Sequence, residues 1–245
     1  MRVNFVVIGV LTISVLAAGC GSGQYDVSPG EKARLAAIIP PGAAGTPIEI
    51  GNVSGNTSQT IASVTTATGG SWFMSADGAG DGGTSTGTFT LVPSAAAVLN
   101  GVIANSGGGW GGAATLGFNF KSSTTTPYDA TQGGSYNAVR VKVSLLAATA
   151  VNVYLRMNDD YGVNAGGGHC AGSAFGKAIT VARTGEFAEI VANFADLAPA
   201  GWDGCAAATF DPANAIHFKL ILDNTDTSND QPYVLSIKSV ELIAN

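Results

Sequence analysis

Large aromatic rings and short polar side chains occur in this sequence in a combination suited to holding hydroxyl-rich rings. The apolar C–H face of a sugar stacks on an aromatic ring, while its hydroxyl groups bond planar amides, carboxylates and guanidinium groups. The candidate rings are Trp72, Trp110, Tyr128, Tyr161 and Trp202. The candidate polar partners are Arg156, Asn158, Asp159, Asp160 and His169. We expect a binding site to draw on both sets.

Most of the polar candidates fall in one stretch, residues 156–170, which reads RMNDDYGVNAGGGHC. It is the most polar long loop next to an expected strand end, and loops at the ends of a β-sandwich often carry binding residues. A solvated turn is the alternative interpretation. The adjacent Asp159 and Asp160 could also hold calcium, although few acidic residues follow them.

The surroundings of two tryptophans leave their roles open. Trp110 stands among five glycines in residues 107–112, so it is either a ring presented to a ligand or a core ring under a bare backbone. Trp72 precedes Phe73 in an expected strand, where successive side chains point to opposite faces. One of these two rings is therefore expected outside the core. His217 alternates with an apolar series and is expected at the surface.

Catalysis and nucleic-acid binding find little support. The two histidines, His169 and His217, leave a Ser-His-Asp arrangement open, and 17 acidic residues allow accidental pairs of the kind that a glycosidase needs. The glycine-rich runs do not lie between a strand and a helix, as a phosphate-binding loop would. The net charge is −6 and the 11 basic residues are scattered, which argues against a nucleic-acid partner. We expect a protein that is not an enzyme.

The elements that must position these residues are expected to be strands. Only 11% of the residues are charged, and β-rich runs alternate with clusters of Gly, Asn, Asp and Ser. The expected strands are residues 61–67, 71–76, 86–92, 98–104, 115–121, 138–146, 150–158, 177–182, 187–193, 215–223 and 233–243, with a short helix at 194–197. No helical run is long enough for crossover connections. The sequence therefore predicts an all-β fold, a two-sheet antiparallel β-sandwich.

The first twenty residues predict an export signal. Residues 1–20 read MRVNFVVIGVLTISVLAAGC, a basic start, a short apolar run and small residues before a cysteine. This ending resembles the lipobox of bacterial lipoproteins, with Ala17 where Leu is commonest. The resemblance implies a signal peptide over 1–19, acylation of Cys20 by fatty acids such as palmitate, and a membrane anchor. Gly21 after the cysteine implies the outer membrane. An ordinary secretory signal is the alternative.

Beyond the anchor, residues 20–46 read as a flexible linker and 47–245 as one domain. Two cysteines remain in that domain, Cys170 and Cys205. In an oxidising compartment an even pair of cysteines predicts a disulfide. A metal site with His169 is the alternative, but CxxC spacing and a fourth ligand are missing.

Several short motifs follow one another in an informative order. They are residues 70–77 (GSWFMSAD), 87–90 (GTFT), 109–112 (GWGG), 116–120 (LGFNF), 128–130 (YDA), 138–143 (AVRVKV), 175–177 (FGK), 194–197 (FADL), 201–202 (GW) and 210–212 (FDP). This order resembles the galactose-binding-like jelly-roll domains related to carbohydrate-binding modules. The resemblance implies a β-sandwich that binds a polysaccharide or other glycan on its concave sheet or at a loop edge. A structural or adhesive lipoprotein with a protein partner is the alternative, and a glycan hydrolase is a third.

That family often holds a structural calcium ion with acidic residues near the first and last strands. Here Lys238 stands where an acid is expected in the last strand, and an ammonium group repels the ion. We therefore expect no cofactor and no metal, and a structural calcium is doubtful.

Overall fold

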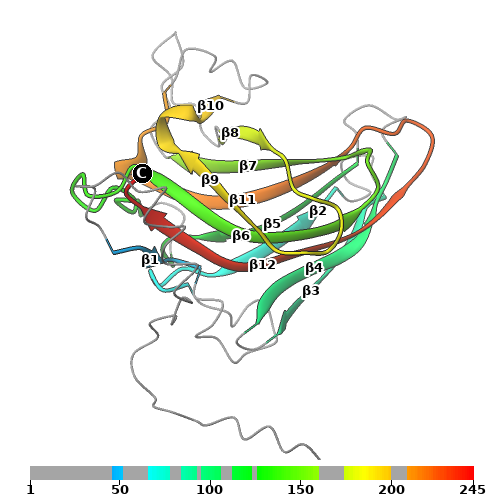
Figure 1. Cartoon of the computed structure of the whole chain (residues 1–245), viewed down its shortest axis with the longest axis horizontal. Coiled ribbons are helices and arrows are strands. Elements are labelled where there is room, and N and C mark those ends of the chain that lie inside the picture. The colour runs from blue at the N-terminus through cyan, green and yellow to red at the C-terminus, as the bar shows by residue number, and fades with distance from the viewer. Residues whose placement is uncertain are drawn as a thin grey trace, which may run out of the picture.

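Alternating apolar and polar residues build two antiparallel sheets that are stacked face to face (Figure 1). The structure is a computed structural model that describes residues 46–51, 66–77, 84–92, 95–105, 112–122, 126–159, 174–199 and 209–245. Every strand pairing within these ranges is antiparallel. The predicted fold class, a two-sheet antiparallel β-sandwich, is confirmed.

The first sheet is called the β12 sheet here, after its longest strand. Its strand order is β3-β4-β12-β6-β9, and the short β1 pairs with the end of β12. Its strands are β1 (Ile48–Glu49), β3 (Thr86–Val92), β4 (Ala96–Ile103), β6 (Ala138–Ala147), β9 (Ala188–Asn193) and β12 (Gln231–Ile243).

The second sheet is called the β11 sheet and has the strand order β10-β8-β7-β11-β5-β2. Its strands are β2 (Trp72–Ala76), β5 (Ala113–Asn119), β7 (Val151–Asp159), β8 (Ala174–Ile179), β10 (Ala198–Pro199) and β11 (Ala215–Asn224). Two short 3-10 helices, Phe194–Asp196 and Pro212–Asn214, connect strands. The described part of the chain contains no helix long and apolar enough to cross a membrane.

Most of the predicted strands are present within a few residues of their expected ends, and the helix expected at 194–197 is the first 3-10 turn. The strand expected at 61–67 lies largely outside the described residues. The strand expected at 177–182 begins earlier, at Ala174. The predicted signal peptide and the linker up to residue 45 also lie outside the described ranges.

A cluster of aromatic rings fills the space between the sheets. The ring of Phe118 lies 5.1 Å from those of Trp72 and Phe218 and 5.5 Å from that of Phe120. Trp72 is 2% exposed, and its Nε1 donates a hydrogen bond to the carbonyl of Gly51 at 2.8 Å. Because Trp72 and Phe118 are cross-strand partners, this cluster also fixes how β2 pairs with β5.

Truncating the centre of this cluster should destabilise the fold strongly. Phe118→Ala removes a fully buried ring that contacts three others, so the free energy of unfolding should fall by roughly 3–5 kcal/mol. Denaturant unfolding followed by tryptophan fluorescence measures this loss. Ser75→Ala on the neighbouring strand, where the side chain is exposed, is the matched control and should change stability by less than about 0.5 kcal/mol. Equal effects of the two substitutions would contradict the assigned core.

Candidate functional site

The outward side of the β11 sheet gathers polar and aromatic side chains from four adjacent strands. In β11, Phe218, Leu220 and Leu222 are buried between the sheets, so the residues that alternate with them point outward. The same alternation holds in β2, β5 and β7. We call the outward set the β11 face; it comprises Phe73, Ser75, Asp77, Thr115, Asn119, Asn152, Tyr154, Arg156, Asn158, His217, Lys219, Ile221 and Asp223.

One row of directly paired residues crosses the middle of this face. Phe73 pairs with Gly117, Gly117 with Lys219, Lys219 with Arg156, and Arg156 with Gly176. A Cβ atom on Gly117 would lie closest to the carbonyl oxygen of Phe218 and 2.8 Å from Cβ of Lys219. One on Gly176 would lie closest to the carbonyl oxygen of Leu155 and 2.6 Å from Cγ of Arg156. Larger residues at the two glycines would therefore press on the backbone of the neighbouring strands as well as on the stems of the two basic side chains. The glycines leave these stems room close to the sheet.

One aromatic ring of the face lies beside Arg156, and another lies beside His217. The guanidinium carbon of Arg156 is 5.4 Å from the centre of the Tyr154 ring, a cation–π contact. The ring of Phe73 meets that of His217 edge-on, with centroids 5.9 Å apart and planes at 85°. The face thus presents two rings and two cations on neighbouring strands.

His217 is held by a short hydrogen bond on the same face. Its Nδ1 lies 2.5 Å from Oδ1 of Asn119, the residue directly opposite on β5. Burial, followed by the positive charge of Lys219, lowers the pKa of His217 from 6.5 to about 4. The ring is therefore neutral at pH 7, and its Nδ1 donates to the amide oxygen.

Burial also acts on the charged groups of the face. It lowers the pKa of Lys219, and the charge of Arg156 lowers it further. Burial raises the pKa of Asp223, Arg156 opposes that rise, and Asp77 adds to it. These charges therefore lie close enough to influence one another, in an environment that is less polar than water.

Two of the predicted aromatic candidates, Trp72 and Tyr128, make packing contacts, and only Trp72 is fully in the core. Trp72 lies in the core, so the structure removes it from the ligand-binding candidates; its neighbour Phe73 takes the outward position, as one of the two was expected to do. Tyr128 is half-buried and stacks on Phe120 with centroids 5.1 Å apart and planes at 7°, while the Lys121 ammonium lies 5.2 Å from its ring centre. Burial, and secondarily the charge of Asp129, raises the pKa of Tyr128.

Three of the predicted polar candidates lie at the end of β7: Arg156 and Asn158 in the strand expected at 150–158, and Asp159 one residue beyond its expected end. Arg156 is in the central row, and Asn158 is the partner of His217, 4% exposed. Asp159 is 3% exposed and accepts a hydrogen bond from the backbone N–H of Asp211 at 2.6 Å. This bond gives Asp159 a role in holding the chain before β11.

The remaining predicted site residues lie outside the described residues and stay predictions. They are Cys20, Trp110, Asp160, Tyr161, His169, Cys170, Trp202 and Cys205. The disulfide between Cys170 and Cys205 and the acylation of Cys20 belong to this group.

Sequence reasoning did not select Asp77, Tyr154, Lys219 or Asp223 for a site. Lys219 and Asp223 carried a signal, because they share the polar series of 215–223 with His217. The pairing of β11 with β7 brings Tyr154 and Arg156 beside that series. The order of strands in a sheet is not visible in the alternation of any one strand.

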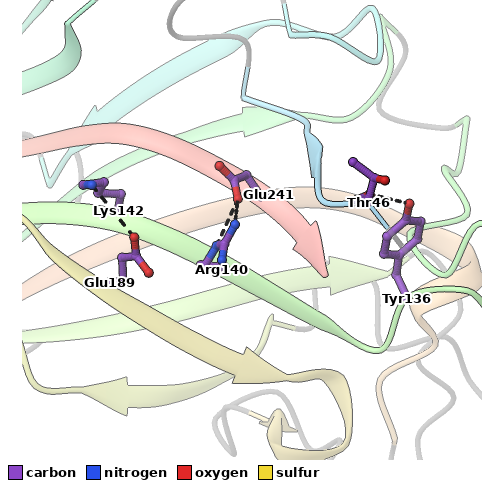
Figure 2. Close-up of polar contacts among 6 residues, drawn as sticks. All are labelled: Thr46, Tyr136, Arg140, Lys142, Glu189 and Glu241. Atoms are coloured by element: carbon purple, nitrogen blue, oxygen red, sulfur yellow. Dashed lines mark hydrogen bonds and ion pairs between the residues drawn. The ribbon is translucent and has the colours of Figure 1, made fainter. Parts of the chain in front are cut away.

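The outer face of the β12 sheet has a different character. Two of its basic side chains are paired: Arg140 bonds Glu241 through Nε at 2.9 Å and also through its Nη2, and Lys142 lies 3.8 Å from Glu189 (Figure 2). Further along, the exposed side chains are aliphatic, including Leu146, which is 55% exposed. These paired groups are less available to bond the hydroxyl groups of a sugar.

A hollow of about 510 Å³ lies beside the 3-10 helix that follows β9. Its amides already bond one another: Asn245 Nδ2 donates to Asn193 Oδ1 at 2.7 Å, and Asn137 Nδ2 donates to the carbonyl of Asn245 at 2.9 Å. In its wall, Tyr136 is buried and donates its hydroxyl hydrogen to the carbonyl of Thr46 at 2.8 Å (Figure 2). We therefore place the candidate site on the β11 face.

One motif of the sequence is typical of serine hydrolases. Residues 83–87 (GTSTG) match the Gly-x-Ser-x-Gly pattern, but Ser85 precedes strand β3 and not a helix, and its Oγ accepts a hydrogen bond from the N–H of Ala104 at 2.9 Å. Within the described ranges, no group of three or more His, Cys, Asp or Glu residues could hold a metal ion.

Known proteins share the architecture of this chain. No family model and no curated protein matches it. Among solved structures, the family 11 carbohydrate-binding module of the cellulosomal cellulase Lic26A-Cel5E of Clostridium thermocellum matches with a TM-score of 0.52 and 9% identity, over 82% of this chain and 96% of that one. This chain has the fold of a carbohydrate-binding module. The family resemblance predicted from the motif order is thereby confirmed at the level of fold.

Two further structures are more distant. The family 11 module from Clostridium thermocellum in complex with a β-1,3-1,4-mixed-linked tetrasaccharide has a TM-score of 0.47 and 9% identity, over 71% of this chain and 88% of that one. A family 30 carbohydrate-binding module has a TM-score of 0.40 and 12% identity, over 61% and 76%. At these identities the likeness concerns the fold alone.

The neutral state of His217 predicts a pH dependence of stability. Its pKa of about 4 lies below the ordinary 6.5, so the unfolded chain binds the proton first as pH falls. The stability that the neutral ring contributes is complete above 6.5 and declines as pH falls from 6.5 towards 4. Denaturant unfolding of the intact protein across that range, compared with His217→Gln, measures it; the variant should lose less stability on acidification. Titration of the His217 ring near 6.5 by NMR would contradict this account.

Proposed function

We propose that this protein is a non-catalytic glycan-binding module whose ligand lies on the β11 face. The observation that carries the proposal is the central row, in which two basic side chains stand between glycines, with Phe73 in the same row and the ring of Tyr154 beside Arg156. This arrangement combines rings that a sugar can stack on with polar groups that its hydroxyl groups can bond.

The chemistry of the face suits a sugar. Phe73 and Tyr154 offer apolar ring surface for the C–H faces of a pyranose. Arg156 and Lys219 donate hydrogen bonds, and the carboxylates of Asp77 and Asp223 accept them. Because these polar groups are half-buried, each bond that they form with a ligand is less exposed to competing water.

The likeness in fold supports the proposal. The matched family 11 module belongs to a cellulase system, and its name states that it binds carbohydrate. A non-catalytic role fits the position of Ser85, whose hydroxyl oxygen already accepts a hydrogen bond from the N–H of Ala104. If the ligand of this face were a protein or another surface, the test below would show no binding to any polysaccharide.

The proposal includes a location. The first twenty residues suggest export and acylation at Cys20, which would tether the sandwich to the cell envelope through residues 20–46, most simply at the outer membrane. A tethered binding module would keep glycans near the cell surface or the periplasmic wall.

Removing the rings of the β11 face should weaken binding. Phe73→Ala and Tyr154→Ala each delete a stacking surface worth about 1.4 kcal/mol, so the dissociation constant should rise about tenfold for each. Affinity electrophoresis of the intact protein in a panel of soluble polysaccharides, followed by calorimetry with the best one, measures the change.

Leu146→Ala and Val234→Ala on the outer face of the β12 sheet are the matched controls, because both side chains are exposed and apolar. They should leave the dissociation constant unchanged. Binding that survives the loss of both rings of the β11 face, or that depends on Leu146 and Val234 in their place, would exclude this face as the glycan site.

Acylation is tested separately. Labelled palmitate should be incorporated into the full-length protein in cells and be lost in Cys20→Ser, with the variant released from the membrane fraction. Cys170→Ser, which alters a cysteine far from the signal segment, should keep the label. Incorporation that persists in Cys20→Ser would refute the anchor and leave the binding proposal standing.

A further inference from the structure

We propose that the glycan held on the β11 face is acidic, and that Lys219 binds its anionic substituent, a uronate carboxylate or a sulfate ester. This inference rests on the function proposed above. It is carried by the position of Lys219 in the central row and by the kinds of side chain that surround it.

Lys219 is a half-buried cation beside a second cation. Arg156 is its direct partner on β7, Gly117 is its partner on β5, and His217 and Ile221 flank it on the outward side of its own strand. Among the residues that the structure describes, no carboxylate lies within ion-pair distance of its ammonium group. Placing two cations together in a partly desolvated site has a cost that an anion would remove.

Arg156 has partners of its own away from Lys219. Its guanidinium group lies over Tyr154, one position further along β7, and its charge acts on the carboxyl group of Asp223. Asp223 lies four residues beyond Lys219 on β11, and the negative charge of Asp77 raises the pKa of its carboxyl group. The negative charges of the face therefore gather at one end, and the excess positive charge falls on Lys219.

The groups nearest Lys219 at the other end of the face are neutral. His217 is uncharged at pH 7 and is bonded to Asn119, and Asn158 lies opposite His217. Amides of this kind can donate to an anion without bringing a competing charge. Among the described residues, the outward groups next to Lys219 at this end therefore bring no negative charge to it, although the chain as a whole carries −6.

The test compares acidic polysaccharides with uncharged forms of the same chains. The intact protein is titrated with polygalacturonate, alginate and hyaluronate and with their carboxyl-reduced forms, and with carrageenan and its desulfated form. Ionic strength is kept at about 0.15 M, where charges more than about 8 Å apart are screened. We expect at least one acidic chain to bind about tenfold more tightly than its uncharged form. The carboxylate and sulfate arms then show which anion is preferred.

Variants show whether Lys219 carries this preference. Lys219→Met should reduce the tenfold preference to about twofold or less, and Lys219→Arg should retain most of it. Lys142→Met on the outer face of the β12 sheet removes the same unit of charge from a lysine paired with Glu189, so it should leave the preference intact. Unchanged denaturant midpoints would show that the variants are folded.

The outcomes separate this inference from the proposed function. If uncharged glycans bind as tightly as acidic ones and the binding is lost in Phe73→Ala and Tyr154→Ala, the acidic specificity is wrong and the glycan-binding face stands. If Lys142→Met weakens binding as much as Lys219→Met, the preference is an effect of net charge and the role of Lys219 is wrong. If no polysaccharide of either kind binds, both proposals fail.

Discussion

The burial of aromatic rings between the sheets is the constraint on which the rest of the structure depends. Phe118 of β5 is directly opposite Phe218 of β11, and their rings stack with centroids 5.1 Å apart. Because strand side chains alternate, a slip of one residue would turn these rings outward and move Lys219 into the core. The strong preference of the rings for burial therefore sets the register, and the register places Lys219 beside Arg156.

The two sheets have the same antiparallel architecture, but the charged groups on their outer faces are arranged differently. On the outer face of the β12 sheet, ionic groups such as Arg140 and Glu241 neutralise each other, which is the usual arrangement for a solvated surface. On the β11 face, half-buried groups of like charge are neighbours, and a histidine is held neutral. Like charges placed together on a partly buried surface have an energetic cost, and arrangements of this kind cluster at binding and catalytic sites, which is why the proposed function is assigned to this face.

Much of the fold could be predicted from the sequence, because the alternation within a strand reports burial directly. The series of Val139, Val141 and Val143 predicted an inward face, and all three side chains are fully buried. The site could be predicted only in part, because it depends on which strands are neighbours. Arg156 was selected as part of a polar stretch at the end of an expected strand, but its partner Lys219 is 63 positions away in the chain, and no pattern in either segment joins the two. Trp72 was selected as a ring for a ligand, but it lies in the core. The alternation of its short strand showed that Trp72 and Phe73 point to opposite faces and did not show which face is the inner one.

The central claim is that ligands bind on the outer side of the β11 sheet, and a map of amide chemical shifts tests it most directly. The intact, isotope-labelled protein is titrated with an oligosaccharide of the best-binding polysaccharide while the backbone signals of both sheets are followed by NMR. The account predicts that the largest shifts fall on the central strands of the β11 sheet, at Gly117, Arg156, Gly176 and Lys219, with little change in β4 and β12. Shifts concentrated on the β12 sheet, with the signals of these four residues unmoved, would contradict it.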